Sequence, residues 1–136
     1  MKKFALLLCL ISSFCLTSGA SAREIITDMD VSVTVNADSS VRVTEGIIFT
    51  AEGREIRRGL IRSVPVVHME NGRRVRGKFT VERALLDGGP VPYEVRAEGD
   101  LEEIYLGDDS FLSLGAHRYD ITYTLTRQLI FHDDGD

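Results

Sequence analysis

The stretch DMDVSVTVNADSSVRVTEGIIF, residues 28–49, determines the fold that we expect for this chain. Valine alternates with serine and threonine from Val31 to Val35, and the alternation resumes from Val41 to Thr44 after a short polar turn. A period of two on both sides of a turn is typical of an antiparallel hairpin with one buried face. We therefore expect the odd-numbered residues of the first strand, from Ile25 to Val35, to face the core.

The same alternation continues along the rest of the chain. Residues 53–67 contain Pro65, which cannot donate to a strand ladder, so they are predicted as an edge strand or a crossing loop. The other expected strands cover residues 23–35, 41–51, 78–86, 92–97, 101–106 and 117–130. In the loop at residues 107–115, Phe111, Leu112 and Leu114 are expected to point inward. Short strands separated by frequent turns predict an all-β fold, an antiparallel β-sandwich of about seven to eight strands.

The first 22 residues have the features of a secretory signal peptide, which we expect to be helical. Lys2 and Lys3 are followed by an apolar run over residues 4–16, and Ala20-Ser21-Ala22 is a cleavage site of the A-x-A type. The apolar run is shorter than the roughly 20 residues that span a bilayer. The sequence thus predicts a signal peptide at residues 1–22 and an extracytoplasmic β-sandwich domain at residues 23–136.

Composition restricts the chemistry and the partners of that exported domain. Both cysteines, Cys9 and Cys15, lie in the predicted signal peptide, so the domain is expected to fold without a disulfide. Without Lys2 and Lys3 the chain holds 14 basic and 21 acidic residues, a formal charge of −7. An acidic exported domain of this kind is not expected to bind nucleic acid.

Three stretches of the chain, taken together, resemble a known family. They are Asp28-x-Asp30-Val31 followed by Val41-x-Val43-Thr44-Glu45, then Arg58-Gly59-Leu60-Ile61-Arg62-Ser63-Val64-Pro65, and finally Gly115-x-His117-x-Tyr119-x-Ile121-x-Tyr123. Their order and spacing are similar to the N-terminal extracytoplasmic domain of the family known as domain of unknown function 2207, which comprises predicted membrane proteins. The resemblance implies an exported β domain with a membrane tether, and it implies no established activity.

The chain departs from this family pattern at two places. Ile61 stands where the family usually has a tyrosine. Family members continue from an Asp-rich stretch into membrane-spanning helices, whereas this sequence ends at Asp136. Two interpretations follow: a fragment of a membrane-tethered protein, or a free exported version of the domain.

Glu45 is the one acidic residue in phase with the apolar positions of the second strand. Burying a carboxylate without a partner costs roughly several kcal/mol, because the charge loses its hydration, so Glu45 needs a cationic partner. We predict that Arg62 reaches Glu45 and ties the segment after Gly53 to the hairpin. The alternative interpretation is an acid/base pair in an active site.

Charge is distributed unevenly along the sequence. Residues 94–109 hold seven acidic residues and one basic residue, whereas a basic segment precedes them. That segment contains Arg54, Arg57, Arg58, Arg73, Arg74, Arg76 and Lys78. The two segments either form solvated faces that meet each other, or the basic one contacts anionic lipid headgroups or an acidic partner.

No sequence motif indicates a cofactor, a metal or a catalytic nucleophile. His68, His117 and His132 are far apart in the sequence, and the acidic end at residues 132–136 lacks a calcium-loop pattern. His117 is interpreted as a hydrogen-bonded structural residue. We therefore expect an exported, non-enzymatic module without a cofactor that binds a partner protein or another envelope component. The alternatives are a hydrolase with a carboxylate site on the sandwich loops and a calcium-dependent adhesion-type module. A pocket with two or more converging titratable groups would favour the hydrolase, whereas the binding interpretation expects no such pocket.

Overall fold

The computed structural model describes residues 25–129. The predicted signal peptide, its cleavage site and the acidic end at residues 132–136 lie outside these residues. Within residues 25–129 the chain forms strands, turns and loops and contains no helix, so no helix there could span a membrane.

Ten strands follow one another along the described chain, and every pair that is hydrogen-bonded is antiparallel. The strands are β1 (Ile26–Val35), β2 (Val41–Ala51), β3 (Gly59–Pro65), β4 (Val67–Glu70), β5 (Arg73–Arg76), β6 (Phe79–Leu86), β7 (Gly89–Pro90), β8 (Tyr93–Glu98), β9 (Leu101–Gly107) and β10 (Gly115–Leu125). The predicted all-β antiparallel fold is confirmed, and the second strand has the predicted bounds.

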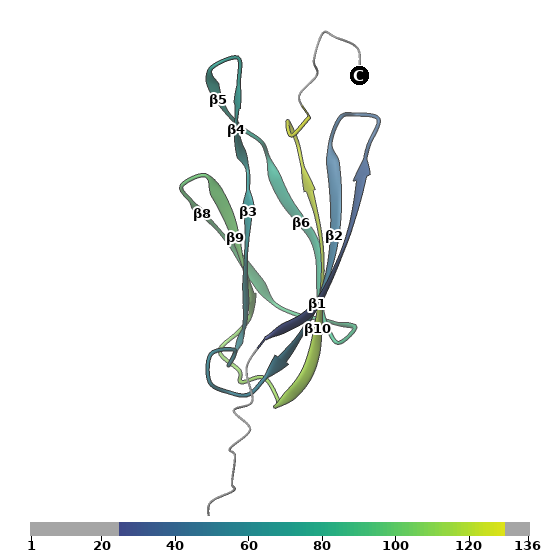
Figure 1. Cartoon of the computed structure of the whole chain (residues 1–136), viewed down its shortest axis with the longest axis vertical. Coiled ribbons are helices and arrows are strands. Elements are labelled where there is room, and N and C mark those ends of the chain that lie inside the picture. Colours follow the sequence, from purple (N-terminus) through teal and green to yellow (C-terminus); the bar gives the residue numbers. More distant parts are fainter. Residues whose placement is uncertain (1–24, 130–136) are drawn as a thin grey trace, which may run out of the picture.

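The strands form two main layers and a protruding hairpin. One sheet has the order β1-β2-β10-β6-β7, the other has the order β3-β9-β8, and β4 pairs with β5 alone. Figure 1 shows the two sheets facing each other, with the β4–β5 hairpin extending beyond the end of β3. This arrangement makes β1 an edge strand of the first sheet and β3 an edge strand of the second.

Local chemistry explains where the hairpins turn. After β1, the Asp38 carboxylate accepts hydrogen bonds from the backbone N–H and the hydroxyl of Ser40, at 3.0 and 2.6 Å. Between β4 and β5, Asn71 and Gly72 both have positive φ angles, of 48° and 75°. Asparagine and glycine tolerate this conformation best, which is why Asn-Gly closes a two-residue hairpin.

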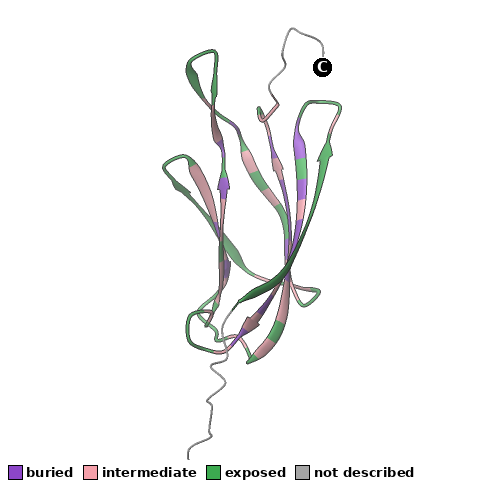
Figure 2. Ribbon diagram, viewed as in Figure 1, coloured by how far each residue is buried: buried purple, intermediate pink, exposed green. Residues whose placement is uncertain are grey.

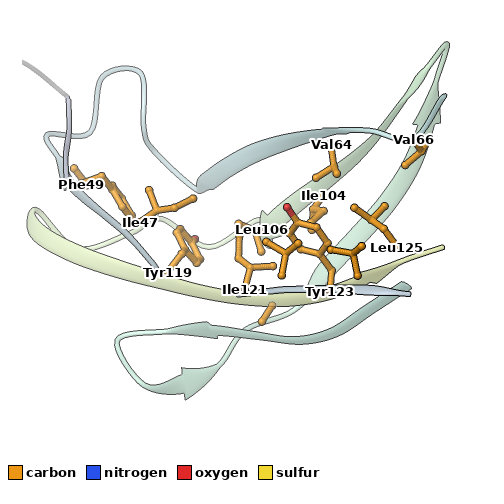
Figure 3. Packing of buried hydrophobic residues seen from close by; sticks show 14 residues of the cluster. Ile47, Phe49, Val64, Val66, Ile104, Leu106, Tyr119, Ile121, Tyr123 and Leu125 are labelled. Carbon is orange, nitrogen blue, oxygen red and sulfur yellow. The ribbon is translucent and has the colours of Figure 1, made fainter. Parts of the chain in front are cut away.

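The core lies between the two sheets. The first sheet contributes buried residues from β2, β6 and β10, and the second contributes residues from β3, β9 and the link after β3. Figure 3 shows side chains of the two layers pointing toward one another, among them Ile47, Phe49, Tyr119, Ile121 and Tyr123 from the first sheet and Val64, Ile104 and Leu106 from the second. Phe49 and Tyr119 stack with ring centroids 5.3 Å apart.

The burial predicted for the first strand is wrong. Every residue of β1 is exposed, including Val31 at 52% and Val33 at 59%. Figure 2 shows β1 exposed along its whole length beside the largely buried β2. Val33 pairs with the buried Val43, so its side chain does lie on the inner face of the sheet, as the alternation predicted. The second sheet does not cover this edge of the inner face.

Two further sequence predictions need correction. Phe111 and Leu114 do not point inward, since they are 69% and 74% exposed. Only Leu112 of this loop packs against the core, where its backbone N–H donates to the carbonyl of Arg57. The last strand also ends earlier than predicted, at Leu125, shortly before Arg127 adopts a positive φ of 56°.

Candidate functional site

The buried carboxylate of Glu45 lies at the centre of a polar network between the sheets. Its residue is 2% exposed. Arg62 of β3 binds it through two hydrogen bonds, Nε to Oε2 at 2.6 Å and Nη2 to Oε1 at 2.7 Å. The Tyr123 hydroxyl of β10 donates to Oε1 at 2.7 Å. The structure thus brings together the two residues predicted from the sequence and adds a third.

The hydrogen bonds of this network join β2 and β10 of the first sheet to β3 of the second sheet. The Arg62 guanidinium also donates to the carbonyl of Ser63 at 2.7 Å, and its hydrogen bonds to Glu45 raise its pKa. Burial, together with the hydrogen bond to Glu45, raises the pKa of Tyr123 far above its usual value. The carboxylate accepts three hydrogen bonds from neighbouring side chains and is 2% exposed, so a substrate would have to displace Arg62 or Tyr123 to reach it. The arrangement therefore favours the structural interpretation over the acid/base one.

The basic and acidic segments meet each other across the second sheet and the β4–β5 hairpin. Arg76 binds Glu102 at 2.8 Å, and Arg74 forms an ion pair with Asp100. Arg58 lies 3.6 Å from Asp109 and stacks over the ring of Phe111. Three of the seven basic residues predicted as a patch are therefore paired with acidic residues from 94–109.

The remaining basic residues do not form one surface. The Arg57 Nε donates to the carbonyls of Gly53 and Arg54, at 3.1 and 2.8 Å. Arg73 and Lys78 are exposed near the β4–β5 hairpin, whereas residues 54–58 lie at the opposite end of the sandwich. Figure 1 shows this separation along the long axis of the molecule.

A cavity of about 320 Å³ lies at the end of the sandwich near residues 107–117. Among its lining residues are the titratable side chains of Arg58, Asp87, Asp108, His117 and Tyr119. The binding interpretation expected no such pocket, and that expectation is wrong. Whether these groups can act as acid, base or nucleophile depends on their hydrogen bonds and protonation.

His117 is held as a double donor in this cavity. Its Nδ1–H donates to the Asp87 carboxylate at 2.7 Å, and its Nε2–H donates to the carbonyl of Ser113 at 2.8 Å. The hydrogen bonds to Asp87 and Ser113 raise the pKa of His117. The Ser113 hydroxyl lies 3.3 Å from Nε2, but a ring nitrogen that already carries a proton cannot act as its general base. His117 therefore fits the structural role expected from the sequence.

Among the buried side-chain atoms that line this cavity, the Tyr119 hydroxyl is the one without a hydrogen-bond partner in residues 25–129. Burial raises its pKa to about 12. A neutral phenol of this kind is neither a base nor a nucleophile at physiological pH. Within the same described residues, no three histidine, cysteine or acidic side chains lie close enough to hold a metal ion.

An apolar groove of about 370 Å³ runs between the edge strands β1 and β3. Ile26 and Met29 of β1 line one side, Leu60 and Ile61 of β3 line the other, and Ile47 lies between them. Ile26, Met29 and Ile61 are 56%, 42% and 58% exposed. Farther along β1, the side chains of Val31, Val33 and Val35 are exposed as well.

Reasoning from the sequence missed two parts of this picture. One is the hydrogen bond from Tyr123 to Glu45, for which the available signal was a phenol in phase with the apolar residues of its own strand. The apolar surface of β1 had no signal in the sequence, because alternation does not report whether a second layer covers a strand.

Comparisons with known proteins agree with the family resemblance noted from the sequence. A family model described as "Predicted membrane protein (DUF2207) N-terminal domain" matches residues 25–136. The chain is 28% identical over 118 residues to "Uncharacterized protein YciQ" of Escherichia coli (strain K12), an alignment that covers 85% of this chain and 19% of that protein. The chain thus spans about a fifth of the length of this curated relative. No solved structure matches.

Proposed function

The chain belongs to the family of predicted membrane proteins named DUF2207, as its N-terminal domain, and on this premise we propose that it is an exported, non-enzymatic binding module. In this proposal the domain lies outside the cytoplasmic membrane, at the periplasmic or extracellular face. It binds a protein or another envelope component through the inner face of β1 and the adjoining groove.

The observation that carries the proposal is the uncovered apolar surface of β1. Its inner-face side chains are 42–59% exposed, and they are Met29, Val31, Val33 and Val35. Contiguous exposed apolar surface on a soluble domain is characteristic of interaction sites, because leaving it in water is unfavourable. The same side chains are bounded by polar residues on the outer face, such as Asp30 and Thr34.

The backbone of the groove suits the same kind of partner. Both β1 and β3 are edge strands, so each presents unpaired N–H and C=O groups along one side. A partner strand can add to such an edge through main-chain hydrogen bonds while its alternate side chains enter the apolar groove.

The non-enzymatic part of the proposal is supported by the chemistry of the end cavity and of the Glu45 network. His117 donates from both ring nitrogens, the Tyr119 phenol is neutral, and the buried Glu45 carboxylate accepts three hydrogen bonds from Arg62 and Tyr123. Binding to anionic lipid has less support than binding at β1, since Arg58, Arg74 and Arg76 are paired with acidic side chains of the same chain.

The test is site-specific photo-crosslinking in intact cells that produce the full chain. A photoreactive residue at Val33 is expected to yield crosslinked products. The matched control is the same residue at Val95, an exposed valine on the edge strand β8 of the other sheet, which is expected to yield few. Equal yields at the two positions would show that β1 is not a preferred contact surface.

A further inference from the structure

We infer that the partner bound by β1 is a second copy of this chain, with the two β1 strands antiparallel about a two-fold axis at Ser32. The two five-stranded sheets would then join into one continuous sheet. This inference deepens the proposed function, because it names the occupant of the surface described there, and it rests on that proposal.

The free backbone groups of β1 belong to its apolar residues. The N–H of Asn36 donates to the carbonyl of Ser40 at 2.8 Å, in the same register that pairs Val35 with Val41 and Thr34 with Arg42. In an antiparallel ladder, hydrogen-bonded and non-hydrogen-bonded pairs alternate. The even-numbered residues of β1 therefore bond to β2, and the backbone groups of Met29, Val31, Val33 and Val35 point to the open edge.

The part of β1 from Val31 to Val35 lacks the devices that usually protect an edge strand. Such strands carry lysine, proline or bulges that prevent pairing with another chain. Residues 26–35 contain no lysine, arginine or proline, and the only irregularity in their pairing with β2 lies between Ile26 and Asp28. The part of β1 from Asp28 to Val35 is therefore a regular strand that another strand can extend.

One two-fold register matches the apolar residues of both copies completely. With the axis at Ser32, Val31 lies opposite Val33 of the second copy and Met29 lies opposite its Val35. All four outward-bonding residues of each copy then face each other on the same side of the sheet. Moving the axis by one residue either way leaves Met29 or Val35 opposite a residue outside this set.

Charge agrees with this register. With the axis at Ser32, Asp30 lies opposite Thr34 of the second copy and Asp28 lies opposite its Asn36, so no two carboxylates oppose each other. An axis at Asp30 would instead place two like charges directly opposite, which destabilises strand pairing. Asp30 is also compensated within its own chain, where the Arg118 Nη2 lies 2.9 Å from its Oδ1.

Cysteine crosslinking tests both the partner and the register. In the full chain carrying Cys9→Ser and Cys15→Ser, Ser32→Cys places two thiols in a non-hydrogen-bonded pair, where Cα atoms lie about 4.5 Å apart. That separation is within the range of about 4.4–6.8 Å that a disulfide spans. The control Thr34→Cys places its thiols four residues apart along the strand, about 13 Å at ~3.3 Å per residue. We expect disulfide-linked dimers from position 32 and none from position 34.

Sedimentation analysis provides the second measurement. The full chain should sediment as a dimer, and Val33→Lys should sediment as a monomer. Its melting temperature should match that of the parent chain diluted until it is monomeric, since Val33 is 59% exposed within one chain. Val95→Lys on β8 is the matched control and should remain a dimer. A monomeric parent chain at all concentrations, or crosslinking at position 34 instead of 32, would overturn the inference. If photo-crosslinks at Val33 then capture a different protein, the proposed function stands without the homodimer; if they capture nothing, both fail.

Discussion

β1 and β2 carry nearly the same sequence pattern, and the structure gives them opposite environments. Val31, Val33 and Val35 are 52–59% exposed, whereas their neighbours Val41 and Val43 on β2 are 8% and 6% exposed. The strands pair with each other and point these side chains to the same face of one sheet. The difference teaches that the alternation specifies a face, while the position of the second sheet decides which part of that face is buried.

The same comparison is sharpest at one residue pair. Val31 lies directly opposite Glu45 in the register, and the apolar residue is the exposed member of the pair while the charged residue is buried. Glu45 tolerates burial because Arg62 and Tyr123 supply three hydrogen bonds. Val31 is exposed because it lies on the edge strand, beside β2 rather than beneath the second sheet.

The largest effect that we expect comes from breaking the buried side of this pair. Arg62→Met leaves the Glu45 carboxylate buried without its cation, which should lower the free energy of unfolding by about 3–5 kcal/mol. Urea denaturation followed by circular dichroism measures this change. Arg42→Met is the matched control, because it breaks the exposed pair between Arg42 and Glu82 and should cost less than about 1 kcal/mol. Similar losses for the two variants would contradict the interpretation.

The next largest effect comes from making the same valine-to-alanine substitution on β2 and on β1. Val43→Ala removes buried methyl groups and leaves a cavity, so it should lower the free energy of unfolding by about 2 kcal/mol. Val33→Ala removes the same atoms from an exposed position and should change it by less than about 0.5 kcal/mol.

This second comparison is measured at a protein concentration low enough for the chain to be monomeric. Raising the concentration should increase the cost of Val33→Ala alone, because Val33 becomes buried only when two β1 strands pair. A cost for Val33→Ala equal to that of Val43→Ala in the dilute sample would show that a second layer covers β1 in solution.

The smallest effect concerns the other neighbour of β2. His117 of β10 lies opposite Phe49 of β2, and its bond to Asp87 raises its pKa. The pKa of His117 is higher in the folded protein than in the unfolded chain, where it is about 6.5. The charged pair with Asp87 therefore stabilises the fold fully when the pH is below the unfolded pKa, and this contribution is lost as the pH rises through the folded pKa. His117→Gln should therefore lower the melting temperature most at about pH 5.5. It should have little effect well above the folded pKa. A melting difference that grows with pH would exclude the charged His117–Asp87 pair. Val33→Ala, on the exposed strand, should show no such pH dependence.

Most of the fold could be predicted from the sequence because strands and turns are local. The alternation in β2 and β10, the Asn71-Gly72 turn and the polar turn before Val41 each depend on residues a few positions apart. The inward phase of Glu45 predicted its burial, and the cost of burying a charge predicted a cationic partner. The hydrogen bond from His117 to Asp87 could not be predicted, because 30 residues separate them and their contact depends on the pairing of β6 with β10.

The sequence by itself determined the all-β antiparallel fold, its family and the inner face of strands such as β2 and β10, because side-chain alternation and turn chemistry act within a few residues. The tertiary structure decided that the three-stranded sheet covers β2 and β10 and leaves the inner face of β1 uncovered. It also decided that Phe111 and Leu114 are exposed and that the basic and acidic segments pair. These outcomes depend on how far one layer extends over another, and no local pattern of residues encodes that distance.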